Sequence, residues 1–197
     1  MSIEAMRYLF YPNSIAVIGG SEKPGTIGRA LMENLLYGGF KGKVYPINPK
    51  YTSVFNLKCY KSILEVSDTV DLAVIAIPAK IVPKVIDECG IKGVKGVIII
   101  SAGFKETGEE GAKLEREIVS IARKYGMRII GPNCLGVYNA YNKMDTIFNP
   151  SDRQAKPNPG SIAFLSQSGA LGAAVLDWAR ALNIGMSLFV SYGNAAD

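Results

Sequence analysis

The sequence predicts an α/β fold with a parallel central sheet. Short apolar runs alternate with stretches of helical periodicity over the first 141 residues. The runs are apolar almost throughout, as in Ile98, Ile99 and Ile100, which is typical of strands covered on both faces. Parallel strands joined by right-handed helical crossovers give a doubly wound sheet. The predicted strands are 14–18, 43–47, 71–77, 94–101 and 127–130.

Three helices are expected between these strands, at 26–37, 79–89 and 109–125. The third helix has the charge distribution that a helix dipole favours, because it opens with Glu109 and Glu110 and closes with Arg123 and Lys124. Gly126 then supplies a helix stop.

The chain changes character after position 141. We expect one doubly wound domain over 1–141, a linker over 142–158, and the first part of a second α/β domain over 159–197. The linker region is rich in Asn, Asp, Pro and Ser and has no apolar period. Beyond it a strand, a helix and a strand are expected at 160–165, 170–182 and 185–191. Two strands and one helix are too few to complete a sheet and its core, so we expect a fragment of a longer or multi-chain protein.

Composition limits the classes of function. The net charge of +5 is mild and the basic residues are scattered, so nucleic acid is not the expected partner. No apolar stretch approaches the ~20 residues that span a bilayer, and no signal peptide is evident, so we expect no membrane association and a cytoplasmic location. Three cysteines far apart suit a reducing compartment and predict no metal cluster. Histidine is absent, which excludes imidazole chemistry and a phosphohistidine within this chain.

The turn after the first strand predicts an anion site. Residues 14–28 read SIAVIGGSEKPGTIG, a buried strand that runs into a glycine-rich loop and then a helix. Small residues let a phosphate approach the backbone, and the free N–H groups of the first helical turn point at it. The loop is longer than the G-x-G-x-x-G fingerprint, which favours a Rossmann-like domain for a phosphate-rich ligand other than NAD. The alternative is a turn that serves connection only.

The end of the second strand favours a phosphorylated ribose. In NAD-binding units an acidic residue there accepts the ribose hydroxyls. Here the positions are Asn48, Pro49 and Lys50, and a lysine attracts a ribose phosphate that a carboxylate would repel. Coenzyme A and NADP both carry such a phosphate, so both remain open. The alternative for Lys50 is a solvated loop lysine.

Other loops at strand ends could complete one groove, at 77–79, 101–106 and 131–136. Cys134 is the thiol on that rim, and the alternative is a small buried hydrophobic residue. The turn Ser166-Gln167-Ser168-Gly169 is a second strand-to-helix anion site by the same physics, and the alternative is an ordinary serine cap.

Six motifs together closely resemble the nucleoside-diphosphate-forming acyl-CoA synthetases, the family of ADP-forming acetyl-CoA synthetase and the succinyl-CoA synthetase α-subunit. The motifs are AVIGGS…PGTIG from Ala16, INPK from Ile47, IPA from Ile77, SAGF from Ser101, GPNCLG from Gly131 and LSQSGA from Leu165. They occur in the family's order and cover essentially the whole chain. The resemblance implies a Rossmann-like CoA-binding domain followed by the start of a flavodoxin-like domain.

The resemblance also implies roles for individual residues. CoA phosphates would be held by the first loop, at Gly20, Ser21, Lys23, Pro24, Gly25, Thr26 and Gly28. The ADP end of CoA would be bordered by Asn48, Pro49 and Lys50. The nucleotide and pantetheine would be lined by Ile77, Pro78, Ala79, Ser101, Ala102 and Gly103, and the thiol would lie near Asn133 and Cys134. An acyl phosphate or phosphohistidine would be received by Ser166, Ser168 and Gly169.

The family's reaction converts acyl-CoA, ADP and phosphate into a carboxylate, CoA and ATP through a phosphorylated histidine. That histidine lies beyond the end of this chain, and so does the ATP-grasp domain that binds ADP or ATP with Mg²⁺. The resemblance therefore implies a CoA-binding portion of a ligase, inactive alone and part of an oligomer in the full enzyme. The alternatives are an NADP-binding oxidoreductase domain and a non-catalytic CoA-sensing module of a protein acyltransferase.

Overall fold

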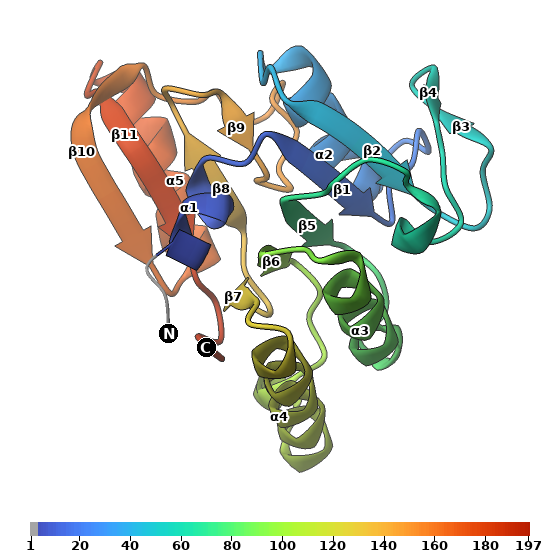
Figure 1. Ribbon diagram of the computed structural model, residues 1–197. Coiled ribbons are helices and arrows are strands. Elements are labelled where there is room, and N and C mark those ends of the chain that lie inside the picture. Colours follow the sequence, from blue (N-terminus) through green and yellow to red (C-terminus); the bar gives the residue numbers. More distant parts are fainter. Residues whose placement is uncertain (1–3) are drawn as a thin grey trace.

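A computed structural model describes residues 4–197, and it contains a five-stranded parallel sheet at its centre (Figure 1). The strands lie in the order β2-β1-β5-β6-β7. Their bounds are β1 (Ser14–Ile18), β2 (Lys43–Ile47), β5 (Leu72–Ile75), β6 (Gly96–Ile99) and β7 (Arg128–Ile130). Each strand pairs in parallel with its neighbour, which confirms the predicted doubly wound sheet.

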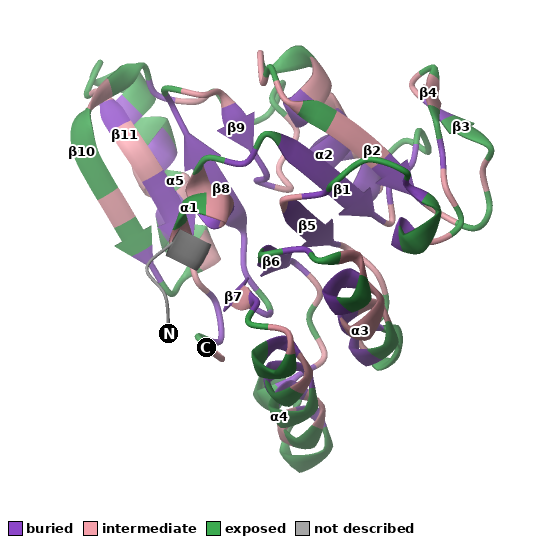
Figure 2. Ribbon diagram, viewed as in Figure 1, coloured by how far each residue is buried: buried purple, intermediate pink, exposed green. Residues whose placement is uncertain are grey.

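Helices cover both faces of this sheet. They are α1 (Glu4–Phe10), α2 (Ile27–Tyr37), α3 (Val82–Lys92) and α4 (Glu109–Lys124), with short 3₁₀ helices η1 (Ile63–Glu65), η2 (Ala79–Ile81) and η3 (Lys105–Thr107). Side chains alternate along β1, so that Ala16 and Ile18 join the core under α3 and α4 while Ile15 and Val17 join the core under α2. Figure 2 shows the central strands β1, β5 and β6 buried and exposed residues along α3 and α4.

The second predicted helix differs from the expected 79–89. A 3₁₀ turn occupies 79–81, and α3 then continues to Lys92. The helix ends where Gly93 adopts a φ of 85°, and the Gly93 N–H donates to the carbonyl oxygens of Cys89 and Gly90. A left-handed residue at this point favours glycine, so Gly93 rather than the earlier Gly90 ends the helix.

A second sheet lies beside the first and has the strand order β10-β11-β8-β9. Its elements are β8 (Gly136–Asn139), β9 (Met144–Asp145), β10 (Pro159–Ser166) and β11 (Met186–Ser191), with helix α5 (Gly169–Ala181) between the last two. From the sequence, only the strands at 160–165 and 185–191 are expected here, and they correspond to β10 and β11. Strand β8 pairs antiparallel with β11, so a segment that precedes position 141 contributes to the second sheet.

The segment 142–158, expected as a linker, contains β9 and several buried residues. Gln154 is 3% exposed and donates from Nε2 to the carbonyl oxygen of Ala173 in α5. Asn34 of α2 donates from Nδ2 to the carbonyl oxygens of Ile147 and Asn149. The segment is thereby attached to a helix of each sheet.

A two-stranded hairpin, β3 (Ser53–Val54) and β4 (Leu57–Lys58), follows β2. Its turn residues, Phe55 and Asn56, both have positive φ angles. The Arg29 guanidinium lies 5.9 Å from the centre of the Phe55 ring, which brings the hairpin against the start of α2. Within residues 4–197, no helix is long and apolar enough to cross a membrane.

A buried ion pair joins β9 to the chain that enters β10. The Asp145 carboxylate lies 3.2 Å from Lys156 Nζ, and the side chains are 7% and 11% exposed. Asp145 Oδ1 also accepts a hydrogen bond from the Ile147 N–H at 3.0 Å. Burial raises the pKa of Asp145 above its ordinary value, and the charge of Lys156 opposes that rise.

We predict that Lys156→Met lowers the free energy of unfolding by about 3–5 kcal/mol at pH 7, because it leaves a buried carboxylate unpaired. The pKa of Asp145 then rises further above its unfolded value. The folded protein therefore gains a proton as pH falls through that pKa, and the loss of stability shrinks. Urea unfolding at pH 7 and pH 5 measures both effects, with the exposed Lys41→Met as control. An equal loss at both pH values contradicts the assignment.

Candidate functional site

The site begins at the loop between β1 and α2, where two glycines permit a close approach of backbone. Gly19 has a φ of 98°, and a Cβ there would lie 2.4 Å from the carbonyl oxygen of Ala76 at the end of β5. A Cβ on Gly28 would lie 1.9 Å from the carbonyl oxygen of Gly19. Both distances are far below van der Waals contact, so the first turn of α2 packs directly on the end of β1.

Hydroxyl groups shape the rest of this loop. Ser21 Oγ accepts the Lys23 N–H at 2.9 Å. Thr26 caps α2, because its Oγ1 accepts the Arg29 N–H at 3.3 Å and donates to the Lys23 carbonyl oxygen at 2.8 Å. The side chain of Lys23 is exposed. The loop is therefore organised by its own hydrogen bonds, and α2 presents its N-terminal turn behind it.

Asn48 joins the end of β2 to the same loop. Its Nδ2 donates to the carbonyl oxygen of Gly20 at 3.0 Å, and its Oδ1 accepts the Lys50 N–H at 3.1 Å. Lys50 is exposed at this edge. Strand β1 lies between β2 and β5, so the loop occupies the point where the strand order reverses, which is where open α/β sheets bind ligands.

Ser101 links the next strand ends in the same way. Its Oγ accepts the Ile77 N–H at 3.1 Å and donates to the Ile77 carbonyl oxygen at 2.6 Å. The Ser101 carbonyl oxygen accepts the Asn133 N–H at 2.9 Å. The loops after β5, β6 and β7 are thus bonded in sequence along the carboxyl edge of the sheet.

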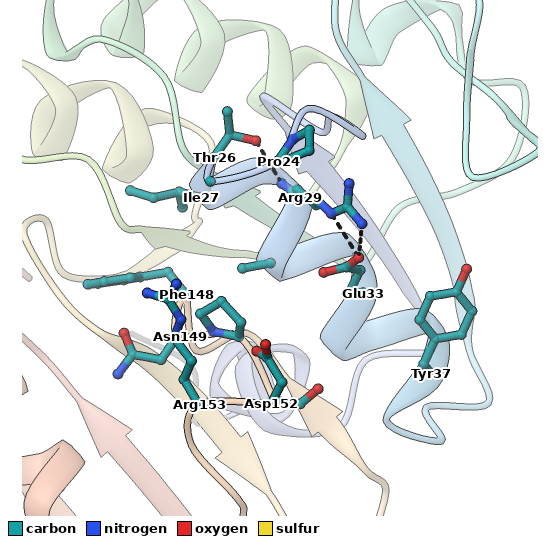
Figure 3. A pocket seen from close by; sticks show the side chains of 14 residues that line it. Pro24, Thr26, Ile27, Arg29, Glu33, Tyr37, Phe148, Asn149, Asp152 and Arg153 are labelled. Atoms are coloured by element: carbon teal, nitrogen blue, oxygen red, sulfur yellow. Dashed lines mark hydrogen bonds and ion pairs between the residues drawn. The ribbon is translucent and has the colours of Figure 1, made fainter.

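Two neighbouring cavities open along this edge. The first, of about 710 Å³, lies between α2 and the segment 148–153, and its lining includes Pro24, Gly25 and Thr26 (Figure 3). The second, of about 630 Å³, lies between the strand-end loops and the start of α5. Both are lined by Ile27, Phe148 and Asn149, so the cavities adjoin.

The second cavity brings together predicted site residues from both sheets, namely Ser101, Ala102, Asn133, Cys134, Ser168 and Gly169. The other predicted residues line neither cavity, namely Gly20, Ser21, Lys23, Gly28, Asn48, Pro49, Lys50, Ile77, Pro78, Ala79, Gly103 and Ser166. Phe148 and Asn149 also line both cavities, although they lie in the segment expected as a linker and no motif marks them.

At the start of α5, both serines form local hydrogen bonds. Ser166 Oγ donates to the Ser168 carbonyl oxygen at 2.9 Å. Ser168 Oγ accepts the Leu171 N–H at 3.2 Å, which makes Ser168 the N-cap of α5. The helix turn therefore begins at the cavity wall with an ordinary serine cap, a geometry that also suits an anion.

The Cys134 thiol is 4% exposed and lies 3.3 Å from the carbonyl oxygen of Ile99. Burial raises its pKa to about 12, so it is neutral at physiological pH. This environment suits a packing residue at the cavity wall. Cys59 and Cys89 are buried as well.

A family model described as a CoA-binding domain matches residues 13–140, and one described as a succinyl-CoA ligase like flavodoxin domain matches residues 159–197. The chain therefore belongs to the CoA-binding domain family, which confirms the resemblance drawn from the sequence motifs.

Similar proteins include subunit alpha of the ADP-forming acetate–CoA ligase I of Pyrococcus furiosus, with 53% identity over 100% of this chain and 42% of the relative. The ADP-forming 4-hydroxybutyrate–CoA ligase of Nitrosopumilus maritimus is 51% identical over 94% of this chain and 26% of its own length. The apo structure of the dinucleotide-forming acetyl-coenzyme A synthetase 1 of Ca. Korarchaeum cryptofilum superposes with a TM-score of 0.91. It is 47% identical over 98% of this chain and 41% of that chain. The chain thus spans less than half the length of these relatives.

We predict that Gly28→Ala destabilises the protein by about 1–3 kcal/mol, because its methyl group would overlap the Gly19 carbonyl oxygen and push α2 from the loop. Gly169→Ala is the matched control at the first turn of α5. A Cβ there would lie 3.4 Å from its nearest neighbour, so stability should change by no more than about 0.5 kcal/mol. Thermal unfolding of both variants tests this, and equal melting temperatures for the two contradict it.

Proposed function

We propose that this chain binds coenzyme A along the carboxyl edge of the first sheet. The observation that carries the proposal is the continuity of the edge. The glycine loop and Lys50 lie at the strand-order reversal, and the adjoining cavities continue past Asn133 to the start of α5. The polar loop is followed along the edge by a partly apolar cavity. This order fits an extended ligand that has phosphates at one end and a thiol at the other.

In this proposal the glycine loop and the N-terminal turn of α2 hold the CoA phosphates, and Lys50 attracts the 3′-phosphate. The pantetheine then follows the loops after β5 and β6, and the thiol lies near Asn133 and Cys134. Ser166, Ser168 and Gly169 receive the phosphorylated group at the second helix N-terminus. Lining by Ile27, Leu135 and Phe148 gives the second cavity apolar walls for the uncharged part of the ligand.

We further propose that the chain is the CoA-binding part of an ADP-forming acid–CoA ligase. The relatives with this name extend well beyond the matched region. The phosphohistidine, and an ATP-grasp domain that binds ADP or ATP with Mg²⁺, belong to the remaining domains or a partner subunit in an oligomeric cytoplasmic enzyme. Leu165, Trp178 and Leu182 support a larger assembly, because they are 62%, 71% and 70% exposed.

Calorimetric titration with CoA, dephospho-CoA and NADPH tests the binding proposal. We expect CoA to bind and NADPH to give no heat of binding, because the edge continues into a cavity suited to pantetheine. Binding of NADPH with no response to CoA would indicate the oxidoreductase alternative. Acetate and 4-hydroxybutyrate are then the first acids to assay once the chain is joined to its remaining domains.

We predict that Lys50→Glu weakens CoA at least about tenfold and dephospho-CoA much less, because the reversed charge repels a 3′-phosphate that dephospho-CoA lacks. Lys41→Glu is the matched control, since Lys41 precedes β2 at the opposite edge of the sheet and is also exposed. Equal losses for the two ligands would show that Lys50 does not contact the 3′-phosphate.

A further inference from the structure

The chain returns to the first sheet after it leaves the second. We call residues 192–197 the return segment. Its Tyr192 N–H donates to the Ser166 carbonyl oxygen at 3.0 Å, and its Asn194 N–H donates to the Pro132 carbonyl oxygen at 2.9 Å. At its end, Asp197 pairs with Arg128 of β7 at 2.6 Å. The return segment therefore runs from the turn before α5 to the edge of the first sheet.

The Asn194 side chain of the return segment makes three hydrogen bonds. It is 7% exposed. Its Nδ2 donates to Glu106 Oε2 at 2.6 Å and to Glu115 Oε2 at 2.8 Å, while its Oδ1 accepts from Asn133 Nδ2 at 3.3 Å. One amide thus meets three polar groups from three different elements.

Glu106 extends this network to the loop after β6. Its Oε1 accepts the N–H groups of Gly103 at 2.6 Å and Phe104 at 3.1 Å. Burial raises the pKa of Glu106, but the hydrogen bonds from Asn194 and from Gly103 and Phe104 outweigh it and hold the pKa below its ordinary value. Glu106 is therefore ionised at neutral pH, and its two oxygens accept hydrogen bonds from Asn194 and from the loop after β6.

Glu115 anchors the same amide from α4. It is 7% exposed, and Lys105 Nζ lies 3.3 Å from its Oε1. Lys105 Nζ also donates to the carbonyl oxygen of Asn194. The charged groups that face Asn194 are thus Glu106 and Lys105 of η3 and Glu115 of α4. An amide satisfies both carboxylates with donors and Asn133 with an acceptor, which neither Asp nor Leu can do.

The two loops that Asn194 connects both contribute to the wall of the second cavity. Ala102, beside Gly103, and Asn133 both line the second cavity, whereas Asn194 does not. Gly193 allows the approach, because it has a φ of 53° and a Cβ there would lie 2.3 Å from the Asn133 carbonyl oxygen. The Asn133 N–H already donates to the Ser101 carbonyl oxygen, and Asn194 adds a side-chain connection between Asn133 and Glu106 from outside the cavity.

We propose that Asn194 is a positioning residue for the pantetheine end of CoA, which fixes the loop after β6 relative to Asn133. This inference rests on the proposed function. Asn194 acts through Glu106 and Asn133 and contacts no ligand itself. The glycine loop at 19–26 lies outside the hydrogen bonds that Asn194 makes. The nucleotide end of CoA is therefore held independently of Asn194.

The test compares two ligands that share the nucleotide end. Adenosine 3′,5′-bisphosphate carries the phosphorylated ribose and lacks pantetheine, whereas CoA has both. In calorimetric titrations of the whole chain, Asn194→Ala should weaken CoA about tenfold and change the bisphosphate dissociation constant less than twofold. An unchanged CoA dissociation constant, or equal weakening of both ligands, overturns the inference.

Asn139→Ala is the matched control for lost stability. Asn139 is 1% exposed and its Nδ2 donates to the Phe10 carbonyl oxygen at 2.9 Å, away from both cavities. It should lower the melting temperature as Asn194→Ala does and leave both dissociation constants unchanged. A tenfold loss of CoA binding in Asn139→Ala would show that instability alone explains the effect and overturns the inference.

A second pair of variants, Asn194→Asp alone and combined with Glu106→Gln, keeps the test informative if Asn194→Ala does not fold. Asn194→Asp places a third carboxylate against Glu106 and Glu115 and should weaken CoA selectively. Adding Glu106→Gln supplies an amide donor for the new aspartate and should recover part of the CoA affinity. No recovery in the double variant overturns the inference. If the unaltered chain does not bind CoA, the proposed function is overturned. If the chain binds CoA and the Asn194 variants have no effect, only this inference is overturned and the proposed function stands.

Discussion

The close contact between the first turn of α2 and the end of β1 is the constraint on which the site depends. The Gly19 carbonyl oxygen occupies the space that a side chain at position 28 would need. This contact places a helix N-terminus against the middle of the sheet edge, beside the end of β2 that Asn48 holds. The loops after β5, β6 and β7 lie farther along the same edge and are bonded to one another through Ser101. Backbone packing therefore sets the position of the first loop, and side-chain hydrogen bonds connect the neighbouring loops to it.

The second sheet completes this edge. Strand β8 leaves the loop that contains Asn133 and pairs with β11, so the loop is bonded to both sheets. Helix α5 consequently begins opposite the strand-end loops and closes the second cavity. Asp145 and Lys156 add a buried ion pair near this junction, at a desolvation cost that only their pairing offsets. The two cavities thus owe their shape to contacts between segments far apart in the sequence.

Local patterns were sufficient to predict much of this fold. The strands 14–18 and 43–47 agree with the structure residue for residue, because apolar runs and turn residues act over a few positions. The pairing of β8 with β11 is nonlocal, and the short β8 lacks a pattern that distinguishes it from a loop. The same holds for Phe148 and Asn149, whose place at the cavities depends on hydrogen bonds from Asn34, more than 100 residues earlier. Motifs could predict the loops of the site, but only the fold shows which of them share a cavity.

The side chains that line the second cavity suit the binding of a ligand more than a reaction with it. The groups nearest the second cavity are hydroxyls, amides and a neutral buried thiol, and histidine is absent from the sequence. Such groups accept and donate hydrogen bonds at neutral pH without exchanging protons with a substrate. The carboxyl groups of Glu106 and Glu115 do not line this cavity and instead accept hydrogen bonds from Asn194. Under the proposed function this surface would hold CoA, and the reacting groups would be supplied from outside these two cavities.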